Sequence, residues 1–216
     1  MLMKAIQAFH EGGFFMWPIL AVSMVGLTLL IERLIYMSVA SSVKKDEFLT
    51  QLNQQILAGN LERCIAMCAQ AKTPLTNIVR AGLLAIASKR TAEEVQTAMD
   101  AVALREIPKL EKRTGLLAML SNIATLLGLL GTVTGMIGAF AAVANVSPSE
   151  KASLLASSIA EAMHCTAFGL IVAIPLLICY GWLQTKGTEL VDDVHEAAVA
   201  TLNFILSNRD KFKNHG

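Results

Sequence analysis

The sequence has few charged side chains, few cysteines and no glycine-rich loop for holding phosphates. Charged residues make up 16% of the 216 residues, whereas an average soluble domain carries about 25%. The net charge is +1, so there is no basic field to attract nucleic acid. The four cysteines have no partner histidines or cysteines at zinc spacing and indicate no disulfide framework. We therefore expect no metal site, no cofactor and no nucleic-acid partner.

Apolar sequence takes the place of the missing charge: 54% of the residues are hydrophobic and the mean hydropathy is +0.54. A bilayer core about 30 Å thick needs roughly 20 apolar helical residues to cross it. Three segments meet this requirement, at residues 14–31, 115–144 and about 157–184. The sequence therefore predicts an all-α protein with three membrane-spanning helices and further long helices outside the membrane.

The first apolar segment has a second interpretation, as a cleaved signal peptide. Its apolar stretch is longer than the usual core of about 7–15 residues. Lys4 is the only basic residue that precedes it, and positive charge follows it instead. These features favour a retained first span.

The distribution of lysine and arginine predicts the orientation of the spans. If the N-terminus lies outside, only Lys4 and Lys151 of the 18 basic residues lie outside. The opposite orientation would place all the others there. Because basic residues favour the cytoplasmic side, we expect an outside N-terminus and a cytoplasmic C-terminus. The second and third spans then form a hairpin with its outer turn at residues 145–151, where Pro148 breaks the helix.

The expected organisation has four parts. They are 1–36, the N-terminal segment and first span; 37–114, a cytoplasmic helical loop; 115–183, the hairpin of the second and third spans; and 184–216, a cytoplasmic C-terminal helix. The last part repeats apolar residues at helical spacing, which indicates an amphipathic helix that packs beside the long charged helix preceding the second span.

Local signals predict the helices of the loop. The first three are expected at residues 46–58, 61–71 and 74–87. Gly59 stops the first of them, and Thr73 caps the third. Thr91 and Glu94 form a predicted capping box, in which each side chain accepts a hydrogen bond from the other's free backbone amide.

A charged helix follows the capping box and reaches the second span, with Pro108 as a site for a kink. Two interpretations stay open for this helix. It continues into the second span as a projecting rod, or it is an ordinary solvated helix with ion pairs between its own turns.

The second span carries a face of small and hydroxylic residues. They recur alternately four and three residues apart, which keeps them on one side of a helix: Ser121, Thr125, Gly128, Thr132, Gly135, Ala139 and Ala142. The third span has a matching face: Ser158, Ala162, Thr166, Gly169 and Ala173. One interpretation is tight helix packing, with Gly128, Gly131, Gly135 and Gly169 at the contact. The other is a central passage whose proton path is lined by Ser121, Thr125, Thr132, Ser158 and Thr166.

Glu161 and His164 are the ionisable residues near the start of the third span. They are three residues apart and therefore neighbours on a helix. Because a carboxylate in lipid is costly, Glu161 is a candidate for the proton path, and His164 is a candidate titrating group. The alternative for both is an interface near the outer surface. The second span contains no Asp, Glu, Lys or Arg, so a proton relay depends on Glu161 or on an acid from a partner.

Two long motifs resemble a known family. Residues 128–140 read GLLGTVTGMIGAF, and residues 158–175 read SIAEAMHCTAFGLIVAIP, followed by Tyr180. They resemble the second-span and third-span signatures of the MotA/TolQ/ExbB proton-channel family. Trp17-Pro18 in the first span and Glu32-Arg33 after it resemble the same family. One span before the loop favours the ExbB/TolQ branch over MotA.

The resemblance implies a homopentamer around a central pore in the bacterial inner membrane. It implies a partner, a single-span ExbD/TolR-like protein, of which about two helices sit in the pore and carry the proton on an Asp. Thr132 and Thr166 match the family's pore threonines, and Glu161 matches its third-span glutamate. The implied function is a motor subunit that uses the proton motive force to work on a periplasmic or outer-membrane target. His164-Cys165 departs from the family pattern.

Two other functions remain as alternatives. A non-conducting oligomeric scaffold would use the same small faces only for packing. A membrane enzyme would need activation of Cys165, and the sequence offers no base positioned for it. We therefore expect a protein that is not an enzyme.

Overall fold

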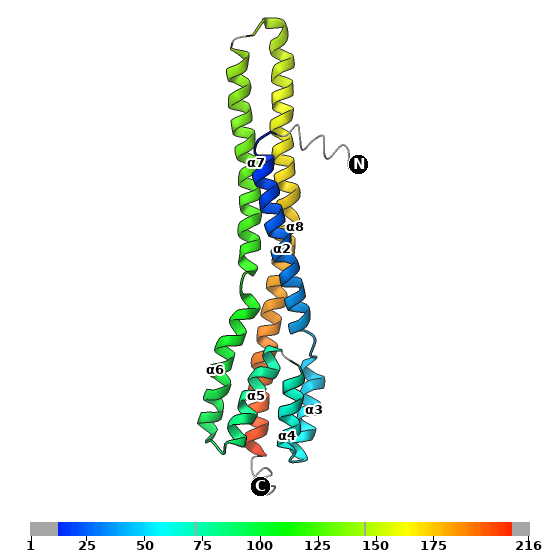
Figure 1. Cartoon of the computed structure of the whole chain (residues 1–216), viewed down its shortest axis with the longest axis vertical. Helices are drawn as coiled ribbons and strands as arrows, with labels where there is room; N and C mark the ends of the chain where they lie inside the picture. Colours follow the sequence, from blue (N-terminus) through cyan, green and yellow to red (C-terminus); the bar gives the residue numbers. More distant parts are fainter. Residues whose placement is uncertain (1–12, 72, 145, 209–216) are drawn as a thin grey trace. The chain divides into compact units, whose positions relative to one another are not determined.

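The computed structural model describes residues 13–71, 73–144 and 146–208, and these residues form helices and short connections without any strand (Figure 1). The helices are α2 Met16–Ala40, α3 Lys45–Leu57, α4 Leu61–Gln70, α5 Pro74–Ala87, α6 Ala92–Glu111, α7 Thr114–Val143 and α8 Pro148–Ser207. The prediction of an all-α fold is confirmed for the described part of the chain. Lys4 and Asn145, used above for the orientation and the outer turn, lie outside the described residues.

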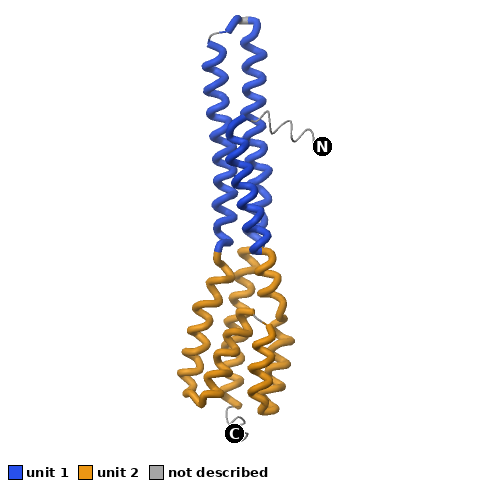
Figure 2. The backbone as a smooth tube through the Cα atoms, in the orientation of Figure 1, with its two compact units in different colours: residues 1–33, 113–182 blue, residues 34–112, 183–216 orange. Residues whose placement is uncertain are grey.

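The chain divides into two compact units (Figure 2). Unit 1 comprises Met1–Arg33 and Arg113–Trp182, and unit 2 comprises Leu34–Lys112 and Leu183–Gly216. Each unit thus combines segments that are far apart in the sequence.

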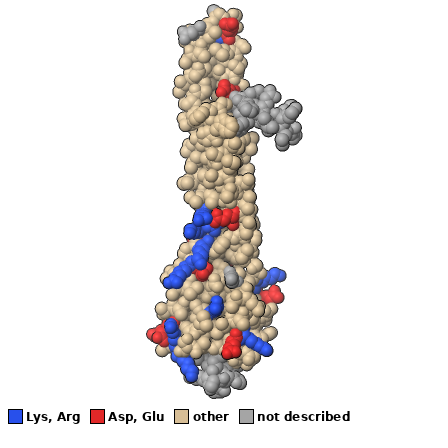
Figure 3. Space-filling view, in the orientation of Figure 1, with Lys and Arg blue, Asp and Glu red and all other residues tan. Residues whose placement is uncertain are grey.

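Three stretches of helix are long and apolar enough to cross a membrane, within Met16–Leu57, Ala92–Val143 and Ser149–Ser207. This confirms the prediction of three candidate spans. Large apolar side chains in unit 1 point outward; Ile137 is 64% exposed and Ile178 is 67% exposed. On the face drawn in Figure 3, unit 1 shows long areas free of charged side chains, whereas unit 2 shows many. Such an apolar surface suits contact with lipid or with other apolar helices.

In unit 1, α2 lies beside the hairpin of α7 and α8 (Figure 1). A Cβ atom added to Gly26 of α2 would lie 2.9 Å from Cδ1 of Leu176 on α8. A Cβ atom added to Gly131 of α7 would lie 3.4 Å from Cβ of Phe15, just before α2. The first span therefore packs against both helices of the hairpin.

The third span and the C-terminal helix form one continuous helix, α8, of 60 residues. It begins at Pro148, the residue predicted to break the helix; a proline is well tolerated at a helix start because its missing N–H has no partner there. Pro175 lies inside α8 without ending it. The boundary predicted near residue 184 is therefore not a break in secondary structure.

The predicted rod from the charged helix into the second span is interrupted. α6 ends at Glu111, Lys112 is extended with ψ 134°, and Arg113 is left-handed with φ 65°. The Arg113 guanidinium donates to Oε1 of Glu32 at 2.7 Å, and Thr114 is buried. These side-chain contacts accompany a backbone conformation that a non-glycine residue rarely adopts.

Unit 2 is organised around an apolar core. Its fully buried members include Leu52, Ile56, Ile78, Val79 and Leu83. Val194, Ala197 and Ile205 of α8 belong to the same cluster, and Ala103 and Ile107 of α6 pack against it. The C-terminal segment is therefore an amphipathic helix that shares a core with the charged helix α6, as predicted. Lys45 at the start of α3 contacts Asp193 at 2.8 Å and Glu196 at 2.7 Å, and these hydrogen bonds raise its pKa.

The local signals of the loop are confirmed. Thr73 caps α5 and accepts a hydrogen bond from the amide of Thr76. At α6, the Thr91 amide donates to Oε2 of Glu94 at 2.8 Å and the Glu94 amide donates to Oγ1 of Thr91 at 3.3 Å. The backbone hydrogen bond from Thr91 lowers the pKa of Glu94. Gly59, with φ 74°, follows the end of α3.

Candidate functional site

The two helices of the hairpin approach closely enough at Gly128 and Gly169 that a larger side chain at either position would meet the backbone of the other helix. A Cβ atom added to Gly128 of α7 would lie 3.2 Å from Cα of Thr166 and 3.3 Å from the carbonyl oxygen of Cys165. A Cβ atom added to Gly169 of α8 would lie only 2.7 Å from the carbonyl oxygen of Ala124. The obstacle is backbone at both positions, so a side chain at Gly169 would force the helices apart, and one at Gly128 would make an unusually tight contact.

The close contact continues along the hairpin. A Cβ atom on Gly135 would lie 2.9 Å from Cβ of Ala162, and one on Gly131 would lie 3.0 Å from Cβ of Cys165. Cys165 is buried at this contact. Much of the small-residue face therefore packs α7 against α8 within a single chain.

Two hydroxyl groups connect α7 and α8 directly. Oγ1 of Thr166 donates to the carbonyl oxygen of Gly128 at 2.8 Å, and Oγ of Ser121 donates to that of Ala173 at 2.7 Å. Ser121 is 3% exposed, so its hydroxyl is enclosed between the helices. Thr166 is only half-buried, so its hydroxyl lies at the margin of the contact.

Two further hydroxyl groups bond within α7. Oγ1 of Thr125 donates to the carbonyl oxygen of Ser121 at 3.1 Å, and Oγ1 of Thr132 donates to that of Leu129 at 2.6 Å. Thr125 is exposed and Thr132 is half-buried. A hydroxyl whose proton is donated in this way still has oxygen lone pairs that can accept.

Thr125, Thr132 and Thr166 lie on the side of the hairpin that faces away from α2; we call them the threonine face. On α7, Gly128 and Gly135 face α8, and Gly131 lies towards α2. Since each helical residue turns by about 100°, Thr132 falls on the opposite side of the α8 contact from Gly131. On α8, Leu176 contacts α2. Thr166 lies about 80° around α8 from Leu176, on the other side of the surface that contacts α7.

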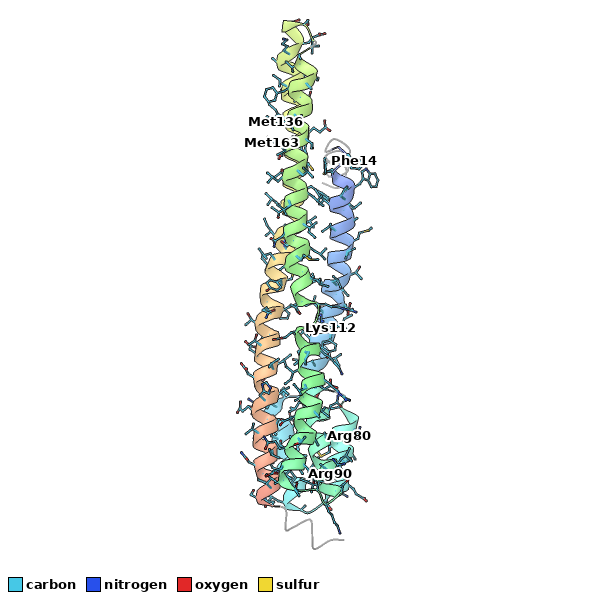
Figure 4. The ribbon with its side chains drawn as sticks, turned by 90° about the vertical axis from the view of Figure 1, so that its left-hand side faces the viewer. Phe14, Arg80, Arg90, Lys112, Met136 and Met163 are labelled. Carbon is cyan, nitrogen blue, oxygen red and sulfur yellow. The ribbon has the colours of Figure 1, made fainter. Side chains whose placement is uncertain are left out.

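Methionines accompany the threonine face and were missed from the sequence. Met136 lies four residues after Thr132, and Met163 lies three residues before Thr166. Figure 4 shows both methionines on the side of the hairpin away from Phe14, which precedes α2. Met163 is 65% exposed. Their helical phase relative to the threonines is the signal that could have identified them.

The remaining predicted site residues lie away from this face. Glu161 is exposed and its Oε1 would lie 2.7 Å from a Cβ atom added to Gly13, close to the start of α2. Ser158 and His164 are half-buried. Glu161 and Thr166 are five residues apart, which separates them by about 140° around α8. The structure thus brings the three threonines together and separates Glu161 from them.

Among the described residues, no group of three His, Cys, Asp or Glu side chains could hold a metal ion. The sequence between Arg113 and Glu150 contains no charged residue. The hairpin thus combines close backbone contact, hydroxyl groups on one side and an uncharged second span. These features define a multi-span helical membrane protein with a polar but uncharged face.

The chain belongs to the MotA/TolQ/ExbB proton channel family, whose model matches residues 70–196. It is 26% identical over 190 residues to a putative biopolymer transport protein ExbB homologue of Methanothermobacter thermautotrophicus, covering 88% of this chain and 66% of that protein. It is 30% identical over 193 residues to a putative ExbB-like biopolymer transport protein of Synechocystis, covering 88% and 74%. With the Tol-Pal system protein TolQ of Haemophilus influenzae it shares 35% identity over 96 residues, 44% of this chain and 42% of that protein.

These matches confirm the resemblance to the ExbB/TolQ branch. The chain spans less than two thirds of the archaeal relative and less than half of the Haemophilus TolQ.

Proposed function

We propose that the chain is the pore-forming subunit of a membrane motor that couples proton flow to mechanical work. Membership of a proton channel family supports this proposal. The observation that carries it is the threonine face, which lines one side of an apolar hairpin whose second span has no charge of its own. Such a face can bind a proton carrier but cannot replace it, because hydroxyl groups of threonine do not titrate near neutral pH.

The threonine hydroxyls favour a particular state of that carrier. Thr125, Thr132 and Thr166 donate their own protons to backbone carbonyls, so each presents an acceptor oxygen. A protonated carboxylic acid can donate to such an oxygen, whereas a carboxylate cannot. A partner's acid would be held while protonated and released on ionisation, which couples proton binding to movement.

The partner in this proposal is a single-span ExbD/TolR-like protein that supplies an intramembrane Asp. Five copies of the chain surround about two partner helices, with the threonine faces inward and α2 outward. Met136 and Met163 flank the threonines with flexible, polarizable side chains, which can repack as a guest helix moves. No covalent reaction is part of this cycle, so the protein is not an enzyme.

The orientation follows from the charge distribution. The N-terminus is periplasmic, unit 2 with its many basic residues is cytoplasmic, and the spans lie in a bacterial inner membrane. Residues 115–183 form the pore hairpin, and residues 37–114 and 184–216 form the cytoplasmic part. The partner's periplasmic portion passes force to an outer-membrane or cell-wall target.

The other predicted site residues have subordinate roles in this proposal. Ser121, enclosed against Ala173, fixes the two pore helices to each other. Ser158 and His164 lie nearer the outer end of the pore. The proton path itself runs along the three threonines.

Native mass spectrometry of the purified full chain, alone and co-expressed with an ExbD/TolR-like protein of the same organism, tests the assembly. We expect five copies alone and five plus two with the partner. Proton flux into vesicles containing the complex tests the path, and Thr132→Val with Thr166→Val should abolish it with assembly intact. A monomer or dimer that ignores the partner contradicts the proposal, as does full flux in the double variant.

A non-conducting scaffold is the second candidate, favoured by the observation that Gly128, Gly135 and Gly169 pack within one chain. Its activity in the cell would survive collapse of the proton gradient by an uncoupler. Loss of activity on uncoupling, at unchanged protein level, would exclude the scaffold.

A further inference from the structure

Glu161 is a carboxylate in an apolar hairpin that the threonine path does not use. It lies on α8, about 140° around the helix from Thr166. Its carboxylate lies next to Gly13, which precedes α2. A Cβ atom on Gly13 would lie 2.7 Å from Oε1 and 3.7 Å from Cδ of Glu161. The carboxylate therefore rests directly against the backbone at the beginning of the first span.

The beginning of α2 has two features that suit a carboxylate. The backbone amide of Met16 donates to the carbonyl oxygen of Gly13 at 3.3 Å, so the helical turn starts at Gly13. The first turn of α2 contains no acidic residue of its own. A helix N-terminus carries about half a positive charge, and in surroundings of low polarity that charge attracts an anion strongly.

We infer that Glu161 supplies, from α8, a negative charge to the N-terminus of α2, whose first helical turn from Met16 has no acidic residue, and that this contact positions the first span on the pore hairpin. In this role Glu161 is a positioning residue and not a proton carrier. The inference deepens the proposed function. Its effect on proton flux rests on that function, whereas the contact between Glu161 and α2 does not.

Gly13 is the residue that makes the contact feasible. Its φ of 72° is a conformation that glycine adopts freely and other residues seldom do. Its missing side chain leaves the room that Oε1 of Glu161 takes up. Phe15, just before α2, contacts Gly131, and Gly26 within α2 contacts Leu176, so Glu161 adds a polar contact at the outer end of an apolar one.

The placement has a consequence for the motor. With α2 held on one side of α7 and α8, the threonine face on the other side stays open to a guest helix. If the outer end of α2 were released, its exposed aromatic residues could cover other parts of the hairpin; Phe14 is 77% exposed. Glu161 would thus affect proton flux through the position of α2.

Moving the negative charge from α8 to α2 tests this inference. The variants are Glu161→Ala, Gly13→Asp and the two together, in the full-length chain. Aspartate is one of the few residues that tolerate a positive φ. Glu150→Ala is the matched control, because Glu150 is an exposed acid of the same helix that accepts from Oγ of Ser147 at 2.8 Å.

The thermal unfolding midpoint of the purified chain should change in opposite directions when Gly13→Asp is made in the native chain and in the Glu161→Ala variant. With Glu161 present, the new carboxylate crowds and repels the old one, and the midpoint falls. With Glu161→Ala, the same substitution restores the charge at the helix N-terminus, and the midpoint rises towards that of the native chain. Equal effects in both backgrounds would overturn the contact. This measurement needs no partner and no proton flux.

Proton flux in vesicles with the partner separates positioning from proton transfer. We expect Glu161→Ala to lower the flux severalfold, the double variant to recover most of it, and Glu161→Gln to leave the pH profile unchanged in shape. A shifted pH profile of proton flux in Glu161→Gln would make Glu161 a proton carrier and overturn the inference. The same conclusion would follow if the double variant recovered the thermal midpoint but not the proton flux. If Thr132→Val with Thr166→Val kept full flux, the proposed function would fail while the midpoint result still stood.

Discussion

Oγ1 of Thr166 on α8 donates a hydrogen bond of 2.8 Å to the carbonyl oxygen of Gly128 on α7. The bond depends on the glycine, because a Cβ atom at residue 128 would lie 3.2 Å from Cα of Thr166. It also fixes the direction of the hydroxyl proton, so that the remaining lone pair of the half-buried oxygen can accept from outside the pair. Close packing and an available acceptor are therefore two consequences of one contact.

Two substitutions of Thr166 separate the close packing from the available acceptor oxygen. Thr166→Val keeps the shape of the side chain but removes the hydroxyl, which should cost about 0.6–1.7 kcal/mol of stability. We expect proton flux to fall by about tenfold or more, since about 1.4 kcal/mol added to a barrier is a factor of ten. Thr166→Ser keeps a hydroxyl and should retain most of the flux. Native mass spectrometry checks that both variants assemble, and equal flux in the two would argue against an acceptor role.

The contact between α7 and α8 predicts which glycines tolerate a methyl group. Gly169→Ala would place Cβ 2.7 Å from the carbonyl oxygen of Ala124, and the helices must separate. We expect a loss of about 1–3 kcal/mol, measured as a lower thermal midpoint in detergent. Gly138→Ala is the matched control, since a Cβ atom there meets nothing within 4 Å. If the two variants melted alike, the helices would not be in the close contact described.

Features that depend on a few neighbouring residues could be predicted from the sequence. The three apolar stretches follow from length and composition, and the Thr91–Glu94 capping box follows from a pattern of four residues. Both predictions were confirmed because these features do not depend on contacts with residues far away in the sequence.

Features that depend on distant residues could not be predicted. The break before α7 requires a left-handed Arg113, which pairs with Glu32 of α2, and no local pattern marks it. The five-residue spacing of Glu161 and Thr166 already places them on different sides of a helix, but only the contact between Glu161 and Gly13 shows which side of α8 lies towards α2. The periodicity of small residues likewise could not say whether their contact is made within a chain or around a passage.

Two helix ends in unit 2 have the same hydrogen bonds but different residues. After α3, the backbone amide of Gly59 donates to the carbonyl oxygen of Ile56 at 3.1 Å. After α5, the backbone amide of Lys89 donates to the carbonyl oxygen of Ile86 at 2.8 Å. Both have a positive φ, 74° and 58°. Because a non-glycine residue pays about 1 kcal/mol or more for this conformation, Lys89→Gly should raise the stability and Gly59→Lys should lower it.

Urea or thermal unfolding of the full chain, followed by helical circular dichroism, measures both effects. Lys89→Val serves as a second control, since a β-branched residue tolerates a positive φ least. A destabilising Lys89→Gly would mean that the lysine side chain makes contacts that outweigh the backbone gain.

Cys64 and Cys68 should behave as inert thiols in the folded protein. Both are buried in the core of unit 2, and burial raises the pKa of Cys64 to about 11 and that of Cys68 to about 12. Because only the thiolate reacts, alkylation near pH 8 should be slow until the protein unfolds. Rapid labelling of native protein at these two residues, identified by peptide mass spectrometry, would contradict their burial.

The same two thiols predict a loss of stability at alkaline pH. An unfolded cysteine ionises near pH 8.5, whereas the folded thiols keep their protons until about pH 11 for Cys64 and about pH 12 for Cys68. Between these values the folded state binds more protons than the unfolded state, so the free energy of unfolding falls as the pH rises. The decline should begin near pH 9 and be smaller in the variant Cys64→Ala with Cys68→Ala, because alanine does not titrate. Unfolding curves of both proteins across this range, compared by slope and not by absolute stability, measure the difference; parallel slopes would show that the thiols titrate alike in the folded and unfolded chains.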